Sequence, residues 1–422
     1  MPRKAYGWKS GAPPEIAPHS LAKHRILREY IEQYLEVVTV NPAMDSVRIT
    51  LVDGFAGGGE YVDPRTSTLH PGSPLILLDA VRASEARINL KRTKPLKIDG
   101  RYFFIEKDPT VATYLREVLR KRGDAPETNA QISVLEGAFE DRLDPIIASI
   151  KSRGRAGRAI FLLDQYGYTG VPMRSLQRIF SELPKAEVFL TLAVGWMTAY
   201  LPTAGVAAER LGIRPEVMKR LAALTEADFD VADPLRRPDL LAIQQLLHYA
   251  STTEVGSTYY TPFFIISRES NRPYWFLHMA NSARAHDVVK ELHWKIENNF
   301  THYGSAGLSM LGYDPAEDPE VTGQMAFDFN DAARARTRAS LIQDIPRRLN
   351  SKFSAGVKFG NLVEATCNET PATRALVAEV VRELCMQGDV EKRGGEGERR
   401  AITTLPLGDD LVRVARQGIL RF

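Results

Sequence analysis

Apolar residues in the first half of the chain follow two alternating patterns. Short runs rich in β-branched and aromatic residues predict strands, and the stretches between them, where apolar residues recur every three or four positions, predict helices. Strands that alternate with helices are typical of a parallel sheet covered on both faces. The predicted strands are 48–53, 101–106, 131–135, 159–164 and 187–193, and the predicted helices are 73–83, 109–122, 145–152 and 172–181.

Further elements extend this pattern at both ends. A helix with one apolar face over residues 27–38 precedes the first strand, and Ser20 is its expected N-cap. Residues 200–252 predict a helical insertion. Two strand-like runs follow at 261–267 and 274–280, and their connection is too short for a crossover helix, so they predict an antiparallel hairpin. Five alternating strands and one hairpin predict an α/β fold with a seven-stranded, doubly wound, Rossmann-like sheet.

The remainder of the chain predicts a second domain. Residues 314–340 begin as an acidic, irregular stretch, and we expect a linker there between a domain of residues 1–313 and a domain of residues 341–422. The second domain has the pattern of a winged helix-turn-helix. Its expected elements are a helix over 359–367, a helix that starts at Thr370 and Pro371 and ends at Gly388, and a hairpin of 389–392 and 401–404.

Composition limits the possible functions. The 422 residues carry 55 Lys and Arg against 52 Asp and Glu, a net charge of +3, so any surface for nucleic acid must be local. Two cysteines, Cys367 and Cys385, exclude a disulfide scaffold and a cysteine-built zinc cluster. The longest apolar stretch, 188–199, is too short to cross a bilayer, and residues 1–20 lack the apolar core of a signal peptide. We therefore expect a cytoplasmic protein that binds no membrane, and the scattered histidines predict no metal site.

The strongest chemical signal is a glycine-rich loop after the first predicted strand. That strand ends at Asp53, and small residues follow as far as Gly59, an arrangement that lets a ligand approach the backbone closely. The second strand ends at Glu106, where an acid can accept hydrogen bonds from a ribose diol. A nicotinamide site would place that acid about 20 residues after the glycines. Glu106 lies 47 residues beyond Gly59, so a nicotinamide-dependent oxidoreductase is disfavoured.

The loop resembles the first motif of class I S-adenosylmethionine methyltransferases, and a wider set of motifs resembles the three-Cys-motif partner (TcmP) family. The motifs are Lys23-His24-x-Ile26-Leu27, Asp53 to Tyr61, Gly72-Ser73-Pro74-Leu75, Phe104-Ile105-Glu106-Lys107-Asp108, Leu163-Asp164-Gln165-Tyr166-Gly167-Tyr168-x-Gly170-Val171-Pro172-Met173 and Lys290-x-x-x-Trp294-Lys295. The resemblance implies S-adenosylmethionine as cofactor and a partner protein that resembles radical enzymes and bears a three-cysteine motif. It also implies a cofactor site made of Lys23, Asp53, Gly54, Phe55, Ala56, Gly57, Gly59, Glu106, Lys107 and Phe139. Ala138 departs from the pattern, because many such enzymes carry an adenine-binding acid there, and Glu140 or the backbone of Phe139 would have to replace it.

A candidate catalytic motif, Asp164-Gln165-Tyr166, follows the fourth predicted strand. It matches the position at which amino-methylating enzymes hold a flat target. Asp164 would accept a hydrogen bond from the target amine, and Tyr166 would stack on the extruded base. Gln165 and Gly167 replace residues that make the usual motif rigid. Two interpretations stay open: an enzyme that methylates an amine, with nucleic acid and especially DNA as substrate, and a non-catalytic binding or regulatory subunit.

The winged helix offers candidate nucleic-acid contacts. Arg374 and Arg382 would face the major groove, and the wing would bring Lys392, Arg393, Arg399 and Arg400 to the phosphates. Glu379 and Glu383 in the same helix weaken this interpretation. A protein–protein module is the alternative, because many winged helices serve only that purpose.

Overall fold

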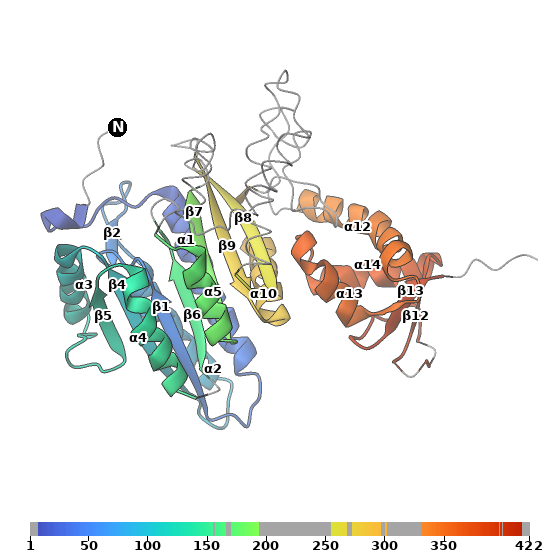
Figure 1. Cartoon of the computed structure of the whole chain (residues 1–422), viewed down its shortest axis with the longest axis horizontal. Coiled ribbons are helices and arrows are strands. Elements are labelled where there is room, and N and C mark those ends of the chain that lie inside the picture. Colours follow the sequence, from blue (N-terminus) through green and yellow to red (C-terminus); the bar gives the residue numbers. More distant parts are fainter. Residues whose placement is uncertain are drawn as a thin grey trace, which may run out of the picture. The chain divides into compact units, whose positions relative to one another are not determined.

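A computed structural model describes residues 7–154, 157–165, 170–193, 255–267, 272–296, 300–301, 331–395, 397–398 and 400–415. The described residues belong to two compact units, one that ends at Phe300 and one that contains residues 331–415 (Figure 1). The predicted insertion at 200–252 lies outside the described residues, as do positions 314–330 of the predicted linker. Within the described ranges, no helix is long and apolar enough to cross a membrane.

The first unit is built on one mostly parallel sheet. Its strands run in the order β10-β8-β9-β7-β6-β1-β4-β5. They are β1 (Ser46–Asp53), β4 (Lys97–Glu106), β5 (Ile132–Glu136), β6 (Arg158–Leu163), β7 (Ala186–Ala193), β8 (Tyr259–Ser267), β9 (Arg272–Ala280) and the two-residue edge strand β10 (Phe300–Thr301). A separate short hairpin, β2 (Glu60–Val62) and β3 (Leu69–Pro71), follows the glycine loop.

The strand order confirms the seven-stranded prediction. Five strands are parallel, and β9 is antiparallel to both β7 and β8. The hairpin therefore inserts the last long strand between the fifth and the sixth, whereas a plain dinucleotide-binding sheet keeps its fifth and sixth strands adjacent. This is the doubly wound sheet of the methyltransferase-like fold. The two-residue β10 adds an edge strand that the sequence did not predict.

Helices cover both faces of the sheet (Figure 1). Because crossovers between parallel strands are right-handed, α2 and α3 lie on one face and α4 and α5 on the other. Helix α1 packs against α2 and α10. The bounds are α1 (Pro18–Val38), α2 (Ser73–Asn89), α3 (Pro109–Lys121), α4 (Phe139–Ser152), α5 (Met173–Glu182) and α10 (Ala283–Ile296).

Two predicted helix starts are wrong. Helix α1 begins at Pro18, so Ser20 lies inside its first turn, and Ala17 occupies the N-cap position. A proline in the first turn costs no hydrogen bond and already has a helical φ, which explains the earlier start. Helix α4 begins at Phe139, and Pro145, expected at its start, lies inside the helix.

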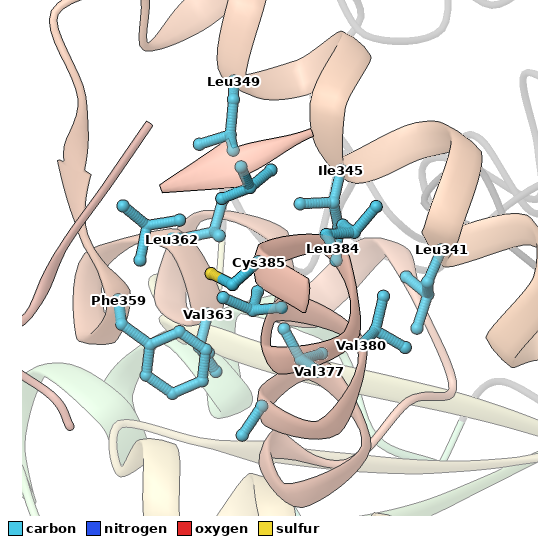
Figure 2. Close-up of a cluster of buried hydrophobic side chains, with 14 of the residues drawn as sticks. Leu341, Ile345, Leu349, Phe359, Leu362, Val363, Val377, Val380, Leu384 and Cys385 are labelled. Atoms are coloured by element: carbon cyan, nitrogen blue, oxygen red, sulfur yellow. The ribbon is translucent and has the colours of Figure 1, made fainter. Parts of the chain in front are cut away.

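The second unit is a winged helix-turn-helix with its own core. Leu341, Ile345 and Leu349 of α12 pack against apolar residues of α13 and α14 (Figure 2). The first ten residues of helix α12, 331–340, fall within the expected linker. The elements are α12 (Asp331–Lys352), β11 (Val357–Lys358), α13 (Phe359–Thr366), α14 (Arg374–Gln387), β12 (Val390–Arg393) and β13 (Leu411–Val414).

The winged-helix prediction is confirmed in type and corrected in two boundaries. Helix α14 is capped by Thr373, whose hydroxyl accepts a hydrogen bond from the Leu376 amide at 3.2 Å, rather than by Thr370. It ends, as predicted, at Gly388, which has a φ of 84°. The second wing strand is Leu411–Val414 rather than 401–404, so the connection between β12 and β13 is much longer than the sequence pattern suggested.

Candidate functional site

Three carboxyl groups gather at one edge of the sheet. Asp53 ends β1, Glu106 ends β4 and Asp164 directly follows β6. These strands are neighbours in the order β6-β1-β4, and parallel strands bring their carboxyl ends to the same edge. The structure therefore brings together the acids that the sequence predicted for the cofactor and for the target.

Asp53 is an unusual acid. Its side chain is fully buried, and burial raises its pKa to about 7, although the Ser73 hydroxyl and the Phe55 amide oppose that rise. The charges of Asp164 and Glu106 raise the pKa further. Within the described part of the chain, the buried Oδ2 of Asp53 has no hydrogen-bond partner. A cation bound beside Asp53 would favour its ionised form and lower its pKa.

Glu106 joins the glycine loop to the start of α3. Its Oε2 accepts a hydrogen bond from the Gly57 amide at 3.1 Å, and its Oε1 accepts one from the Asp108 amide at 2.8 Å. Burial raises the pKa of Glu106, and these two backbone donors partly offset that rise. A carboxylate has about four lone-pair sites, so Glu106 keeps the capacity to accept hydrogen bonds from a ribose diol.

Lys23 contacts the acid predicted to bind the target. Its ammonium group lies 2.6 Å from Oδ1 and 2.5 Å from Oδ2 of Asp164, and the lysine is 8% exposed. Burial alone would raise the pKa of Asp164, but the Lys23 ammonium outweighs that effect, and the pKa lies below its usual value. Asp164 is therefore ionised at neutral pH and held in place by helix α1.

His24 and His70 form a pair that sequence reasoning missed. The two rings stack with centroids 5.6 Å apart, and Tyr61 of β2 lies 5.7 Å from His24. Burial lowers the pKa of His24 to about 3, and the Lys23 charge adds to that effect. His24 therefore stays neutral beside the Lys23–Asp164 pair.

Trp8 is the other residue that the sequence did not reveal. It belongs to a short 3-10 helix, Gly7–Ser10, and its indole lies against Gly57 and Gly58. A Cβ atom on Gly57 would lie 2.8 Å from the indole Cη2, and one on Gly58 would lie closer still to the same ring. The indole N–H donates a hydrogen bond to the Glu60 carbonyl at 2.8 Å. Glycine at 57 and 58 is therefore required by Trp8, whether or not a ligand binds.

The other predicted cofactor residues differ in accessibility. Gly54, Ala56 and Phe139 are buried, Phe55 is half-buried, and Lys107 is exposed. The Phe139 ring packs 6.3 Å from that of Phe55, so its side chain belongs to the core. Glu140, one candidate to replace an adenine-binding acid, forms an ion pair with Arg174 at 2.6 Å.

Gln165 holds its own loop together. It is 3% exposed, and its Oε1 accepts hydrogen bonds from the amides of Gly170 at 2.8 Å and Val171 at 3.0 Å. This use fixes the segment after β6 and takes the amide oxygen away from a substrate. Tyr166 and Gly167 lie outside the described residues.

Several predicted phosphate contacts of the winged helix are paired within the protein. Lys392 is 6% exposed and donates hydrogen bonds to the carbonyl and, at 3.0 Å, the hydroxyl of Thr404. Arg400 forms ion pairs with Asp410 and Glu398.

The other arginines predicted to contact nucleic acid lie in different environments. Arg393 lies 3.8 Å from Glu391, and the Arg374 guanidinium lies over the Phe359 ring. Arg382 is half-buried, and Arg399 lies outside the described residues. A phosphate would have to compete with fixed carboxylates for Arg393 and Arg400.

Comparison with known proteins supports the winged helix most directly. Residues 312–395 match the family model described as a GMT-like wHTH domain. No curated protein matches the chain.

Solved structures match this chain at low sequence identity and low TM-score. A DUF519 protein from Legionella pneumophila str. Philadelphia 1 is 11% identical, covers 61% of this chain and 84% of its own, and has a TM-score of 0.35. Precorrin-6y C5,15-methyltransferase from Geobacter metallireducens GS-15 is 10% identical, with coverages of 60% and 87% and a TM-score of 0.23. A cyclopropane-fatty-acyl-phospholipid synthase-like protein from Lactobacillus casei ATCC 334 is 11% identical, with coverages of 65% and 98% and a TM-score of 0.25. The fold assignment therefore rests on the strand order.

The contact between Trp8 and the glycine loop predicts a coupled pair of substitutions. Gly58→Ala should lower the free energy of unfolding by roughly 1–3 kcal/mol, because the new methyl group displaces the indole. In a Trp8→Ala background the same change should cost much less, with a coupling of roughly 0.5–3 kcal/mol between the two sites. Urea unfolding of the four proteins measures this, and additive effects would show that the indole does not rest on Gly58.

The Lys23–Asp164 pair predicts a pH-dependent effect. The lowered pKa of Asp164 contributes stability that is present above its unfolded-state pKa and is lost as the pH falls through the folded-state value. Lys23→Met leaves the half-buried carboxylate of Asp164 without its partner, so it should lower the free energy of unfolding by roughly 2–3 kcal/mol at pH 7, less than for a fully buried pair. Near pH 4, roughly the ordinary pKa of an aspartate side chain, the loss should shrink because Asp164 of the variant takes up a proton.

Urea titrations at the two pH values test this expectation. The double variant Lys23→Met/Asp164→Asn is the control, and it should recover most of the loss because no charge remains to be buried. If Lys23→Met loses equal stability at both pH values, the Lys23–Asp164 pair does not stabilise the protein through the charge of Asp164.

Proposed function

We propose that this protein is an S-adenosylmethionine-dependent methyltransferase that transfers a methyl group to an amine, with nucleic acid, and DNA in particular, as the favoured substrate. The observation that carries the proposal is the charge at the carboxyl edge of the sheet. Lys23 pairs with Asp164, while Asp53 and Glu106 form no ion pair with any described residue. Such an edge favours a cationic ligand.

The same charge disfavours a pyrophosphate cofactor. A dinucleotide would bring negative charge against Asp53 and Glu106, and it would gain most from a helix N-terminus next to the glycines. Helix α2 starts at Ser73, after an intervening hairpin, so that N-terminus does not directly follow Gly59. The sulfonium and ammonium groups of S-adenosylmethionine suit these acids better.

The residues present fit that cofactor. The unpartnered Oδ2 of Asp53 can accept a hydrogen bond from an ammonium group, and Glu106 can accept from the ribose hydroxyls. The cofactor, when bound, supplies an electrophilic methyl group. The chain supplies the binding groups, the buried setting and the hydrogen-bond acceptor for the target.

Asp164 would orient the target amine. An exocyclic amine has its lone pair delocalised into the ring, and a hydrogen bond from its N–H to a carboxylate makes that lone pair available to the methyl group. Asp164 is ionised and fixed by Lys23, as this role requires. Because the Lys23 ammonium contacts both carboxylate oxygens, the amine must use a second lone pair of one of them or displace the lysine from it.

The winged helix would dock the substrate. Arg374, Arg382, Arg393, Arg399 and Arg400 remain the proposed contacts to nucleic acid, and Lys392 is not among them because it is buried. The resemblance to the TcmP family supports, as a further proposal, a partner protein with a three-cysteine motif.

Two observations favour the non-catalytic alternative. The wing arginines Arg393 and Arg400 face carboxylates of their own domain, and Gln165 serves its own loop. These features suit a binding or regulatory subunit whose winged helix contacts a protein.

Calorimetric titration of S-adenosylmethionine tests the cofactor proposal. Asp53 has a pKa of about 7, so it is about half protonated at pH 7. Binding of the cation should therefore release roughly half a proton per site, measured as a dependence of the binding heat on the ionisation heat of the buffer.

Two controls isolate the role of charge. S-adenosylhomocysteine lacks the sulfonium and should release fewer protons, and Asp53→Asn should abolish the release. If S-adenosylmethionine does not bind, or if it binds with the same proton release in Asp53→Asn, the charge argument is wrong.

A further inference from the structure

A second cleft lies at the opposite edge of the same sheet. It has a volume of about 290 Å³ and is formed by α1, α10 and the first residues of β6 and β7. Because β6 begins at Arg158 and β7 at Ala186, this is the amino-terminal edge, away from the carboxyl groups described above. Its apolar wall includes Val37, Ala285 and Val288.

A buried carboxylate lines this cleft. Glu187 is 4% exposed, and its Oε2 accepts a hydrogen bond from the Tyr30 hydroxyl and lies 3.3 Å from Nε2 of His278. The other oxygen, Oε1, has no hydrogen-bond partner among the described residues. Oε1 is not among the buried polar atoms, so it is open to the cleft, where the N–H group of a ligand can reach it.

The lining of the cleft also carries hydrogen-bond donors, which include Lys185, Asn281, Ser282 and Arg284. The Tyr34 hydroxyl and the Arg158 guanidinium also line it, and neither forms a hydrogen bond with any residue that the structure describes. Burial and the nearby Glu187 charge raise the pKa of Tyr34, so its phenol stays protonated and can donate. Glu187, Tyr34 and Arg158 therefore lie in one small cavity together with apolar residues, a combination found in small-molecule sites.

The strand register explains why the two charges face each other without pairing. Ile160 of β6 is opposite Glu187 of β7, and Arg158 lies two residues before Ile160, so Arg158 and Glu187 project from the same face. Two residues along a strand correspond to about 6.6 Å. Among the described residues, Oε2 of Glu187 lies 3.3 Å from Nε2 of His278, whereas Glu187 forms no ion pair with Arg158. The register thus leaves a gap between a carboxylate and a guanidinium.

We propose that this cleft binds a small zwitterion, specifically a free α-amino acid with an apolar side chain. The ammonium group would donate to Oε1 of Glu187, the carboxylate would accept from Arg158 and the Tyr34 hydroxyl, and the side chain would lie on Val37 and Val288. An α-amino acid carries both charges on one carbon, so it fits a gap between fixed opposite charges. The volume is at the lower end of the range of small-molecule pockets, which suits a ligand of this size.

This inference is independent of the proposed methyltransferase activity. The cleft shares no residue with the carboxyl edge, and its test needs neither cofactor nor nucleic acid. The alternatives are a ligand that is only cationic and a ligand that is only anionic. The probes below distinguish these two from a zwitterion.

Calorimetric titration of the full chain with L-leucine, up to roughly 10 mM, is the test. N-acetyl-L-leucine lacks the ammonium group and L-leucinamide lacks the carboxylate, so both should bind at least about tenfold more weakly than leucine, a loss of about 1.4 kcal/mol. Absence of saturable binding of leucine would overturn the proposal, as would equal binding of either analogue.

Three variants assign the contacts. Glu187→Gln and Arg158→Gln should each weaken leucine binding about tenfold. Tyr34→Phe removes a single hydroxyl and should weaken it by less. Because Glu187→Gln also alters the contacts to Tyr30 and His278, circular dichroism checks its fold, and Arg158→Gln keeps the test decisive if that variant unfolds. Leucine binding that is unchanged in Arg158→Gln and Tyr34→Phe would overturn the proposed site.

Discussion

The mutual repulsion of three carboxyl groups at one edge of the sheet is the constraint on which the candidate site depends. Adjacent parallel strands end at Asp53 and Glu106 and, just beyond β6, at Asp164, so the fold itself places like charges together. Each acid is accommodated differently. Asp164 has Lys23, Glu106 has two backbone amides, and Asp53 has a pKa raised to about 7. The free-energy cost of ionising the buried Asp53 is one that a bound cation can offset.

The glycine loop shows how one pattern can serve two purposes. Its glycines suit the close approach of a ligand, but the indole of Trp8 already lies against Gly57 and Gly58. The same loop donates the Gly57 amide to Glu106. The segment that contains Trp8 is therefore part of the candidate site, and the glycine motif alone is weaker evidence for a cofactor than the charges beside it.

Local sequence patterns predicted the secondary-structure elements that depend on neighbouring residues. The five parallel strands, the hairpin and the helix that ends at Gly388 follow from periodicity and turn residues, and the structure confirms them. Boundaries were less certain where two signals competed, as at Thr370 and Thr373, either of which can cap a helix.

Contacts between distant segments could not be predicted. Lys23 and Asp164 are 141 positions apart in the sequence. Trp8, which contacts Gly57, lies in a proline-rich stretch that shows no helical or strand periodicity. The burial of Lys392 likewise depends on Thr404, a residue that sequence analysis placed in a strand. These contacts decide which predicted residues are free to meet a ligand, so the candidate site was predicted in outline and its electrostatics were not.

Transfer of a labelled methyl group from S-adenosylmethionine to duplex DNA, compared between the natural protein and Asp164→Asn, tests the central claim most directly. If Asp164 orients the target amine, the natural protein should label DNA, and the variant should lose roughly 100-fold or more of that rate while still binding the cofactor. If the natural protein binds the cofactor but labels neither DNA nor RNA, or if Asp164→Asn transfers methyl groups at the natural rate, the enzymatic account is contradicted and the binding-subunit alternative is favoured.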